Sequence, residues 1–461
     1  MQRRSIRFFA LLLLGVLALT GALASGCDFS GVNPLESSAP AVSGDVSGSV
    51  SAGPSEISLI DLPDESPEES PEPEPQVLHF MCCGDNLIHP SVYFTSMEYY
   101  AAAHGTTTDY VTTHEAGYDF APIYEYFAED MAAADYLYIN QETLSGGPGT
   151  TIDGYPSFNS PEAIHETMAA LGADIVNLAH NHMLDSRDDR YLVYTDALIR
   201  SLGPQTIGYY RNFEDTNNIV VTEKNGIRVA WLSYVYATNY HNTDANNYVK
   251  NSYIPYFSQE LCTRQVALAK QQADVVIVSA HWGNEYSFKP NSFQETYAQL
   301  LCELGVDVIV GMHPHCLQPM EWRTNSAGHR TLLTYSLGNF VSGMQEAQCV
   351  LEGVLSFDVR KETDGTVTVE NPLMTPIVCH YVKGKVVNSK LDTGYREFKL
   401  YRLKDYTEDL AAVHGVHYYE KRKSSATLYD SETGRLGAKF SIANMIYTVK
   451  KLIPSEFLPP E

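Results

Sequence analysis

Short apolar runs of strand length recur along the chain and alternate with segments of helical periodicity. The apolar runs are residues 77–83, 136–139, 174–178, 229–234, 275–279, 306–310 and 332–335. The intervening segments, in which apolar side chains recur every three to four positions, are residues 161–171, 190–202, 259–271 and 293–304. Strands that are apolar on both faces and alternate with amphipathic helices predict an α/β domain whose sheet is largely buried.

The pattern changes after residue 340. Residues 353–359 and 366–369 are strand-like, and they flank Thr363-Asp364-Gly365, a sequence typical of a hairpin turn. Residues 381–461 contain one predicted helix, near residues 405–413, and are otherwise irregular in pattern. We therefore expect a domain at residues 77–345, a β-hairpin extension that completes it at residues 346–380, and a helical and irregular extension at residues 381–461.

The N-terminal residues have the pattern of a targeting signal. Arg3, Arg4 and Arg7 precede an apolar run at residues 8–19, and small residues follow up to Cys27. A basic, an apolar and a small-residue segment in this order indicate a secretory signal peptide. Cys27 after Ala-Ser-Gly resembles a bacterial lipobox, whose cysteine is lipidated and becomes the first residue of the mature protein. We expect residues 1–26 to be a lipoprotein signal peptide; an ordinary secreted protein is the alternative.

Residues 27–76 have the composition of a disordered tether. Ser, Gly, Pro and acidic residues dominate from residue 28 onward, with 11 acidic residues and neither Lys nor Arg. Such a segment buries too little apolar area to offset the entropy lost on ordering. Proline-rich chains of like charge are stiff spacers. We therefore expect a protein anchored by lipid to the extracytoplasmic face of the cell membrane, with its folded domain held away from the bilayer.

Charge and cysteine content exclude several classes of protein. The 461 residues carry 56 acidic and 31 basic side chains, a net charge of −25, which argues against a nucleic-acid-binding protein. With 44% apolar residues the chain can build a large core. Seven cysteines remain besides Cys27, and none of them forms a C-x-x-C pair, so we expect buried small apolar residues, not a disulfide framework.

Polar residues that can bind metals follow five of the predicted strands. Because the carboxyl ends of strands meet at one edge of an α/β sheet, these side chains are expected to lie together. Carboxylate and amide oxygens with neutral imidazoles suit Mn, Fe or Zn, and one or two ions are possible. A non-ligand histidine such as His182 could protonate a leaving group. The residues are Asp85, Asn86, Asn140, Glu142, Asn181, His182, Asp185, His281, Trp282, Glu285, His313 and His315.

Six motifs, in order, resemble those of the poly-γ-glutamate capsule-synthesis proteins of the CapA type. They are residues 83–89, 140–142, 177–185, 281–286, 311–321 and 335–340. This family is related to the calcineurin-like metallophosphoesterases. The resemblance therefore implies a metallophosphoesterase-like double-sheet sandwich flanked by helices, with a small C-terminal β-containing extension.

The resemblance also implies roles for individual residues. Asp85 corresponds to the ligand on the first strand, Glu142 to a bridging carboxylate, and Asn181 to an amide ligand. His281, His313 and His315 correspond to the histidine ligands, and His182, with Asp185, to the group that acts on the leaving group. One departure concerns the first metal position, because phosphoesterases have a histidine two residues after the first aspartate and this chain has Leu87.

The remaining strand-end residues are candidate substrate contacts, and some have a second interpretation. Trp282 can line a cleft or pack in the core, and Asn339 can be a site residue or a turn residue. His180, between the motif residues, fits a packing or supporting role better than that of a ligand. The candidate substrate contacts are Asn86, Asn140, Trp282, Glu285 and Asn339.

Two functions follow, from different classes. The first is a metal-dependent hydrolase or transferase acting on a polymer or envelope substrate in capsule or poly-γ-glutamate synthesis, export or attachment. The alternative is a non-catalytic module that binds an anionic polymer or capsule synthase proteins. Removing the 11 acids of the tether and the three arginines of the signal leaves 45 acidic against 28 basic residues. That net charge of −17 disfavours polyanion binding unless Lys383, Lys385, Lys390 and residues 421–423 form a basic patch.

Overall fold

The computed structural model describes residues 74–460, except residues 389 and 424–426. The predicted signal peptide, Cys27 and nearly all of the predicted tether therefore lie outside the described residues. Among the helices of the described part, none is long and apolar enough to cross a membrane.

Two β-sheets form the centre of the folded part. The larger has eight strands in the order β14-β13-β12-β1-β2-β3-β4, with β11 paired to β1. The strands β1 to β4 run parallel, and β12, β13 and β14 continue the sheet antiparallel. Its strands are β1 (Gln76–Leu87), β2 (Tyr136–Asn140), β3 (Ala173–Asn177), β4 (Gln205–Ile207), β11 (Asn339–Ser342), β12 (Leu351–Lys361), β13 (Val367–Lys383) and β14 (Tyr395–Arg402).

The second sheet has six strands in the order β5-β6-β7-β8-β10-β9. Its four central strands run parallel, and β5 and β9 are antiparallel edge strands. The strands are β5 (Val220–Lys224), β6 (Ile227–Val235), β7 (Val275–His281), β8 (Val308–Met312), β9 (Met320–Thr324) and β10 (Arg330–Thr334). A short pair, β15 (Leu428–Tyr429) and β16 (Leu436–Ala438), lies near the C-terminus.

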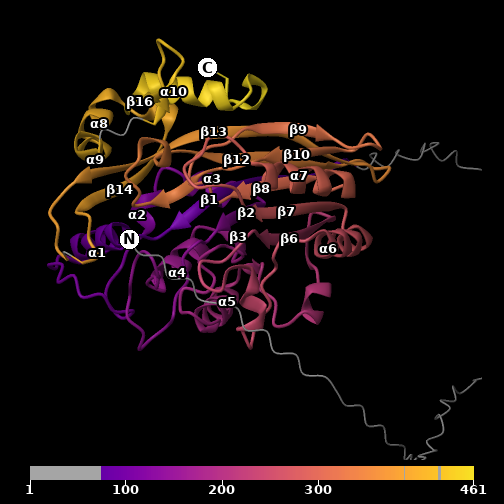
Figure 1. Ribbon diagram of the computed structural model, residues 1–461, viewed down its shortest axis with the longest axis horizontal. Coiled ribbons are helices and arrows are strands. Elements are labelled where there is room, and N and C mark those ends of the chain that lie inside the picture. Colours follow the sequence, from indigo (N-terminus) through magenta and orange to yellow (C-terminus); the bar gives the residue numbers. More distant parts are fainter. Residues whose placement is uncertain (1–73, 389, 424–426, 461) are drawn as a thin grey trace, which may run out of the picture. The chain divides into compact units, whose positions relative to one another are not determined.

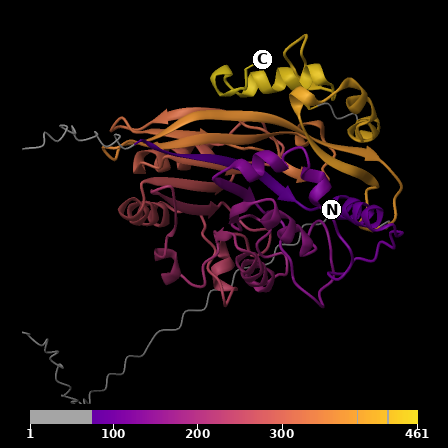
Figure 2. The same cartoon turned by 180° about the vertical axis from the view of Figure 1, so that it is seen from behind.

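The two sheets pack face to face, as the resemblance implied. Trp231 of β6 contacts Phe80 of β1, with ring centroids 6.0 Å apart, and stacks on Tyr138 of β2 at 6.4 Å. The Tyr138 hydroxyl and Ser279 Oγ of β7 lie 2.6 Å apart. The double-sheet sandwich is therefore confirmed, and Figures 1 and 2 show its two layers from opposite sides.

Helices explain why inner strands of the smaller sheet, such as β6, are largely apolar on both faces. Alternate residues of β6 face different neighbours: Val229 and Trp231 face the other sheet, whereas Ala230 and Leu232 face α6 and α7. Each face of a strand is thus buried, which produces a continuous apolar run. The helices are α1 (Pro90–His104), α2 (Ala121–Tyr124), α3 (Ala128–Ala133), α4 (Ala163–Ala170), α5 (Arg190–Leu202), α6 (Gln259–Gln272), α7 (Ser292–Leu304), α8 (Glu408–Val413), α9 (Val416–Lys423) and α10 (Ile442–Leu452).

The seven predicted apolar runs lie in or overlap strands, and the four segments of helical periodicity form α4 to α7. The C-terminal part differs from the expectation, because β14 lies within the segment expected to be helical and irregular. β14 pairs with β13 along residues 395–402, so the large sheet continues past residue 380. The cysteines at positions 82, 83, 262, 302, 316, 349 and 379 are buried and free, as expected.

Candidate metal centre

The parallel strands of both sheets end at one site. In the larger sheet, Asp85, Asn140 and Asn177 are paired in register across β1, β2 and β3. In the smaller sheet, His281 ends β7 and pairs with Met312 at the end of β8. Residues just beyond these strand ends therefore meet in the crevice where α/β proteins bind ligands.

Glu142, two residues after β2, is the most unusual residue of the site. Its side chain is fully buried, and neither carboxylate oxygen has a hydrogen-bond partner among the residues that the structure describes. Glu142 Oε1 lies 3.7 Å from His281 Nε2 and 3.8 Å from His315 Nε2. Burial, and then the nearby Asp85 carboxylate, raises the pKa of Glu142 well above its usual value. A buried carboxylate without partners is costly, and a cation would relieve that cost.

Two buried histidines of the site each have a nitrogen without a hydrogen-bond partner among the described residues. Within the described part of the chain, Nδ1 of His281 and Nδ1 of His313 lack hydrogen-bond partners, and both side chains are buried. Their rings lie 4.8 Å apart. Burial, and then neighbouring imidazoles, lowers the pKa of both residues well below the usual value, so both are neutral. Neutral imidazoles have the lone pair that a metal needs.

His315 is held by two oxygens. Its Nδ1 lies 3.0 Å from Asn339 Oδ1 and 3.1 Å from Asp85 Oδ2. Burial disfavours the charged imidazolium, but the Glu142 and Asp85 carboxylates outweigh this effect and raise the pKa of His315 to about 9. Asn339 also donates through Nδ2 to Glu352 Oε1, at 3.0 Å. Asn339 is thus itself fixed by Glu352, and it orients the His315 ring through Nδ1.

The predicted ligands come together as overlapping groups. Potential ligand atoms lie within 4.8 Å of one another in three sets: Glu142, His281 and His313; Asp85, Glu142 and His315; and Glu285, His313 and His315. Asn181 Oδ1 joins the first set, 2.9 Å from His281 Nε2. Buried carboxylates, an amide oxygen and neutral imidazoles fit a divalent cation, as the sequence predicted.

His182 and Asp185 form a buried pair beside these groups. His182 Nδ1 lies 2.7 Å from Asp185 Oδ2, which also accepts a hydrogen bond from the Phe158 backbone N–H at 2.7 Å. Burial raises the pKa of Asp185 above its usual value. With Nδ1 bound to the carboxylate, Nε2 of His182, which has only a long contact of 3.5 Å with Asn239 Nδ2, is the nitrogen available for proton exchange.

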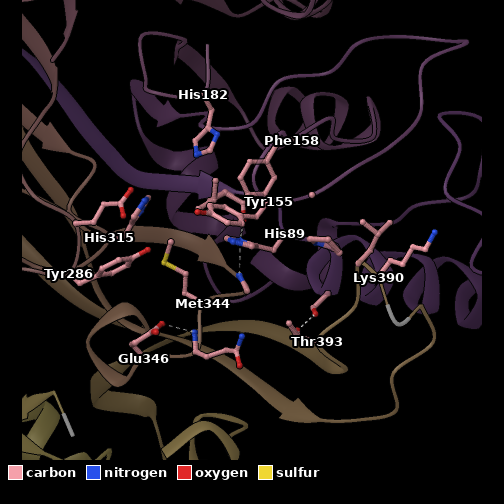
Figure 3. A pocket seen from close by; sticks show the side chains of 18 residues that line it. His89, Tyr155, Phe158, His182, Tyr286, His315, Met344, Glu346, Lys390 and Thr393 are labelled. Atoms are coloured by element: carbon pink, nitrogen blue, oxygen red, sulfur yellow. Dashed lines mark hydrogen bonds between the residues drawn. The ribbon is translucent and has the colours of Figure 1, made fainter. Parts of the chain in front are cut away.

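A pocket of about 300 Å³ opens onto the site. His182, His315 and Glu285 line it together with the rings of Tyr155, Phe158 and Tyr286. Figure 3 shows His182 and His315 toward one end and Lys390 at the opposite end. The rest of the wall comes from Leu87 and His89, beside the start of α1, and from segments after β11 that include Met344, Lys390 and Thr393.

Four of the five predicted substrate contacts lie inside the protein and do not line the pocket. Asn86 bonds to Gln141 and Tyr124, Asn140 bonds to Asp85 and Asn177, and Asn339 bonds as described above. Trp282 is fully buried in the core, where it stacks on Phe257 and donates to the Tyr335 carbonyl. None of these four side chains lines the pocket, whereas Glu285 is exposed and lines it.

The sequence analysis missed several neighbours of the site. Tyr236 contacts the His313 ring at 4.7 Å, and Asn239 Oδ1 lies 3.2 Å from Asn181 Nδ2. Both residues follow β6, so the strand-end rule that found the other residues could have found them. His180, for which the sequence analysis expected a packing or supporting role, is fully buried, and its ring lies 6.1 Å from that of His281. Glu352, which accepts a hydrogen bond from Asn339, was missed as well. An acidic residue in the otherwise apolar first half of β12 was the sequence signal that could have identified it.

Comparison with known proteins agrees with the motif pattern. The chain is 30% identical over 248 residues to the capsule biosynthesis protein CapA of Bacillus anthracis, covering 51% of this chain and 56% of that one. It is 35% identical over 121 residues to the PGA biosynthesis protein CapA of Bacillus subtilis (strain 168), covering 26% and 29%. The chain thus matches about half the length of the first relative and less than a third of the second.

Two solved structures are similar at low identity. The NAD nucleotidase NadN of Haemophilus influenzae aligns with a TM-score of 0.41 and 10% identity, over 79% of this chain and 66% of that one. The sulfate thiohydrolase SoxB of Thermus thermophilus aligns with a TM-score of 0.35 and 14% identity, over 66% and 57%. Residues 79–344, more than half of the chain, match the model of the bacterial capsule synthesis protein family PGA_cap, and the protein belongs to that family.

Proposed function

We propose that this protein is a metal-dependent hydrolase or transferase that acts on an anionic polymer or another envelope substrate in capsule or poly-γ-glutamate synthesis, export or attachment. The observation that supports this most strongly is Glu142. It is a fully buried carboxylate whose oxygens lack partners within the described residues, and it faces two imidazoles at under 4 Å. Structural carboxylates in protein cores are normally hydrogen-bonded or paired, whereas a carboxylate that binds a metal can lack protein partners when no ion is bound.

The ligand set determines what a cation would do here. Asp85, Glu142, Asn181, His281, His313 and His315 would hold it. A divalent cation in such a site acts as a Lewis acid and makes water a better nucleophile near neutral pH.

The protein itself would supply proton transfer and orientation. His182 has Nδ1 fixed by Asp185, so its Nε2 can give a proton to a leaving group or take one from a nucleophile. The pocket that His182 lines would hold the substrate against the ligands and limit access of bulk water.

We also propose that Cys27 carries a lipid anchor on the extracytoplasmic face of the membrane. The support is the order of Arg3, Arg4, Arg7, the apolar run and Cys27, followed by an acidic spacer. Replacing Cys27 by Ser is expected to move the protein from the membrane fraction to the soluble fraction. Retention in the membrane would contradict lipidation at this residue.

The test of catalysis separates metal binding from turnover in the full-length protein. Metal content is measured after growth and purification with Mn, Fe and Zn supplied, and phosphoester and amide substrates are screened. His281→Ala and His313→Ala should lose both metal and turnover. His182→Ala should keep its metal and lose turnover by about 10²- to 10⁴-fold. His79→Ala, which changes an exposed histidine on β1, is the matched control and should match the wild type.

The non-catalytic alternative gives a different result. A protein that holds no metal, with variants that behave like the wild type, would contradict the hydrolase. Salt-sensitive binding of polyglutamate that His182→Ala leaves unchanged would then identify a polymer-binding module.

A further inference from the structure

His89 is a motif residue that the candidate metal centre does not use. It lies two residues after the end of β1, and it belongs to none of the three groups of potential ligand atoms found among the described residues. It lines the pocket together with His182 and His315. Figure 3 shows it between the His315 end of the pocket and Lys390. This position indicates contact with a substrate and not with a cation.

The backbone after β11 fixes which nitrogen of His89 carries the proton. The Gly343 N–H donates to His89 Nδ1 at 3.2 Å, and a Cβ at Gly343 would lie only 2.8 Å from His89 Cβ. The Leu87 carbonyl also lies 3.2 Å from Nδ1, but it already accepts the His89 backbone N–H at 2.9 Å. Because Nδ1 accepts the Gly343 hydrogen bond, we assign the ring proton to Nε2. Burial lowers the pKa of His89 to about 3, so at neutral pH the ring is neutral and Nε2–H is a donor.

Lys390 is positioned by a braced loop between β13 and β14. Its backbone N–H donates to Asn388 Oδ1 at 3.0 Å, and the Asp392 N–H donates to the Asn388 carbonyl at 2.7 Å. Asp392 Oδ1 in turn accepts a hydrogen bond from Ser91 Oγ at 3.3 Å. Ser91 stands at the start of α1, two residues after His89. The loop that carries Lys390 is thus linked to the segment that carries His89, and both residues line one pocket.

The charges of the pocket indicate what these two donors can bind. Lys390 is the one lysine or arginine among the described residues that line the pocket, and the acids Glu285 and Glu346 line it as well. One cation beside two acids suits a group with a single negative charge better than a phosphate monoester, which carries about −1.5 to −2. An imidazole N–H and an ammonium group can each donate to one oxygen of a carboxylate.

We propose that His89 and Lys390 form a subsite that binds a free carboxylate of the substrate, beside the group that the metal centre holds. This inference rests on the proposed function and names the feature of the substrate that the pocket recognises. Each residue of a γ-linked glutamate chain carries such a carboxylate next to an amide bond. His89 binds through Nε2–H and Lys390 through its ammonium group, and neither transfers a proton in the reaction.

The test measures binding, with two probes and full-length protein supplied with Mn²⁺. One probe is a short γ-linked glutamate oligomer, and the other is the same oligomer with its carboxylates converted to amides. In calorimetric titration, Lys390→Gln and His89→Leu should each lose about 10-fold in affinity for the carboxylate oligomer and little for the amide oligomer. His89→Gln, which keeps an N–H donor near the position of Nε2, should recover most of the loss.

Lys385→Gln is the matched control. Lys385 is an exposed lysine of the same loop that does not line the pocket, so this variant has the same change of net charge as Lys390→Gln. It should bind both oligomers as the wild type does. Thermal unfolding checks that His89→Leu is folded, and Lys390→Gln, which changes an exposed side chain, tests the subsite even if His89→Leu is not.

Three results would overturn the subsite. They are equal losses in Lys385→Gln and Lys390→Gln, wild-type affinity in Lys390→Gln, and a wild type that does not prefer the carboxylate oligomer to the amide oligomer. Metal content, measured in the same samples, distinguishes these results from failure of the proposed function. A wild type that holds its metal but fails to bind the carboxylate oligomer contradicts the subsite alone, whereas a wild type without metal contradicts the hydrolase.

Discussion

At the scale of single residues, the buried polar side chains of the site divide by their partners. Glu142, His281 and His313 have side-chain atoms without a hydrogen-bond partner in the described part of the chain. Asn140 and Asn339 use their amides to hold Asp85 and His315. All five stand at strand ends in the sequence, so residue type and position predicted membership of the site. Whether each residue binds a metal or supports a ligand depends on which neighbours form hydrogen bonds with its amide or carboxylate. A single sequence does not show those neighbours.

Asn339 gives the first prediction. Asn339→Ala removes the acceptor of His315 Nδ1 and the donor to Glu352 Oε1. We expect affinity for Mn²⁺ to fall about 10- to 100-fold, because supporting residues orient metal ligands. We also expect a loss of about 1–3 kcal/mol in the free energy of unfolding, because Glu352 is left buried without its donor. Calorimetric titration and urea unfolding measure the two effects.

Asn218→Ala is the matched control, since Asn218 is exposed and bonds to Asp215 far along the chain from the ligands. It should change neither quantity appreciably. Wild-type affinity in Asn339→Ala would mean that Asp85 alone suffices to orient His315.

At the scale of elements, the apolar strands and amphipathic helices were predictable, and the edge of the large sheet was not. β14 carries Arg396, Lys399 and Arg402 between its apolar residues, so its composition resembles that of a surface segment. Its role appears only with its neighbours, since α1 and α2 pack against it. The family segment ends at residue 344, yet β12, the neighbour of β1, comes later in the chain. The site therefore depends on strands outside that segment.

Arg396 links β14 to α1 and gives the second prediction. It is 5% exposed, and its guanidinium donates to Glu98 at 2.8 Å and to both oxygens of Asp392 at 2.9 and 2.7 Å. Arg396→Leu leaves Asp392 buried without its counter-charge, which typically costs about 3–5 kcal/mol. Urea unfolding at neutral pH should show this loss.

Arg360→Leu is the comparison variant, because Arg360 pairs with Glu362 at the surface of the hairpin. Surface pairs contribute about 0–1 kcal/mol, so its loss should be small. Equal losses in the two variants would show that the buried pair adds nothing beyond the packing of β14.

At the scale of the whole molecule, the C-terminal segment that contains α8, α9 and α10 forms a layer on the large sheet. Figures 1 and 2 show it, in yellow, along β13. Two buried histidines lie where it meets the sheet. His380 Nδ1, on β13, lies 2.6 Å from the Tyr406 hydroxyl, and the His414 ring lies 4.7 Å from Phe440. The two imidazoles are 5.2 Å apart, so charging either one brings a cation into an apolar contact.

This contact predicts that acid loosens the layer. Burial lowers the pKa of His380 to about 4, and burial, then His380, lowers the pKa of His414 well below its usual value. An unfolded histidine takes up its proton near pH 6.5. Below that pH the unfolded chain binds more protons than the folded one, so stability falls as the pH falls from about 6.5 toward 4. For His380 alone the loss between pH 7 and pH 5 is about 2 kcal/mol.

Urea unfolding of the wild type and of His380→Gln at both pH values isolates this contribution. Glutamine can still bond to the Tyr406 hydroxyl but carries no titrating proton, so the variant should lose about 2 kcal/mol less than the wild type between pH 7 and pH 5. His79→Gln, at an exposed position on β1, should lose as much as the wild type. If His380→Gln loses as much unfolding free energy between pH 7 and pH 5 as the wild type, the fold accommodates the charged imidazole. The layer must then be held by Phe440, Met445 and Val449 independently of pH.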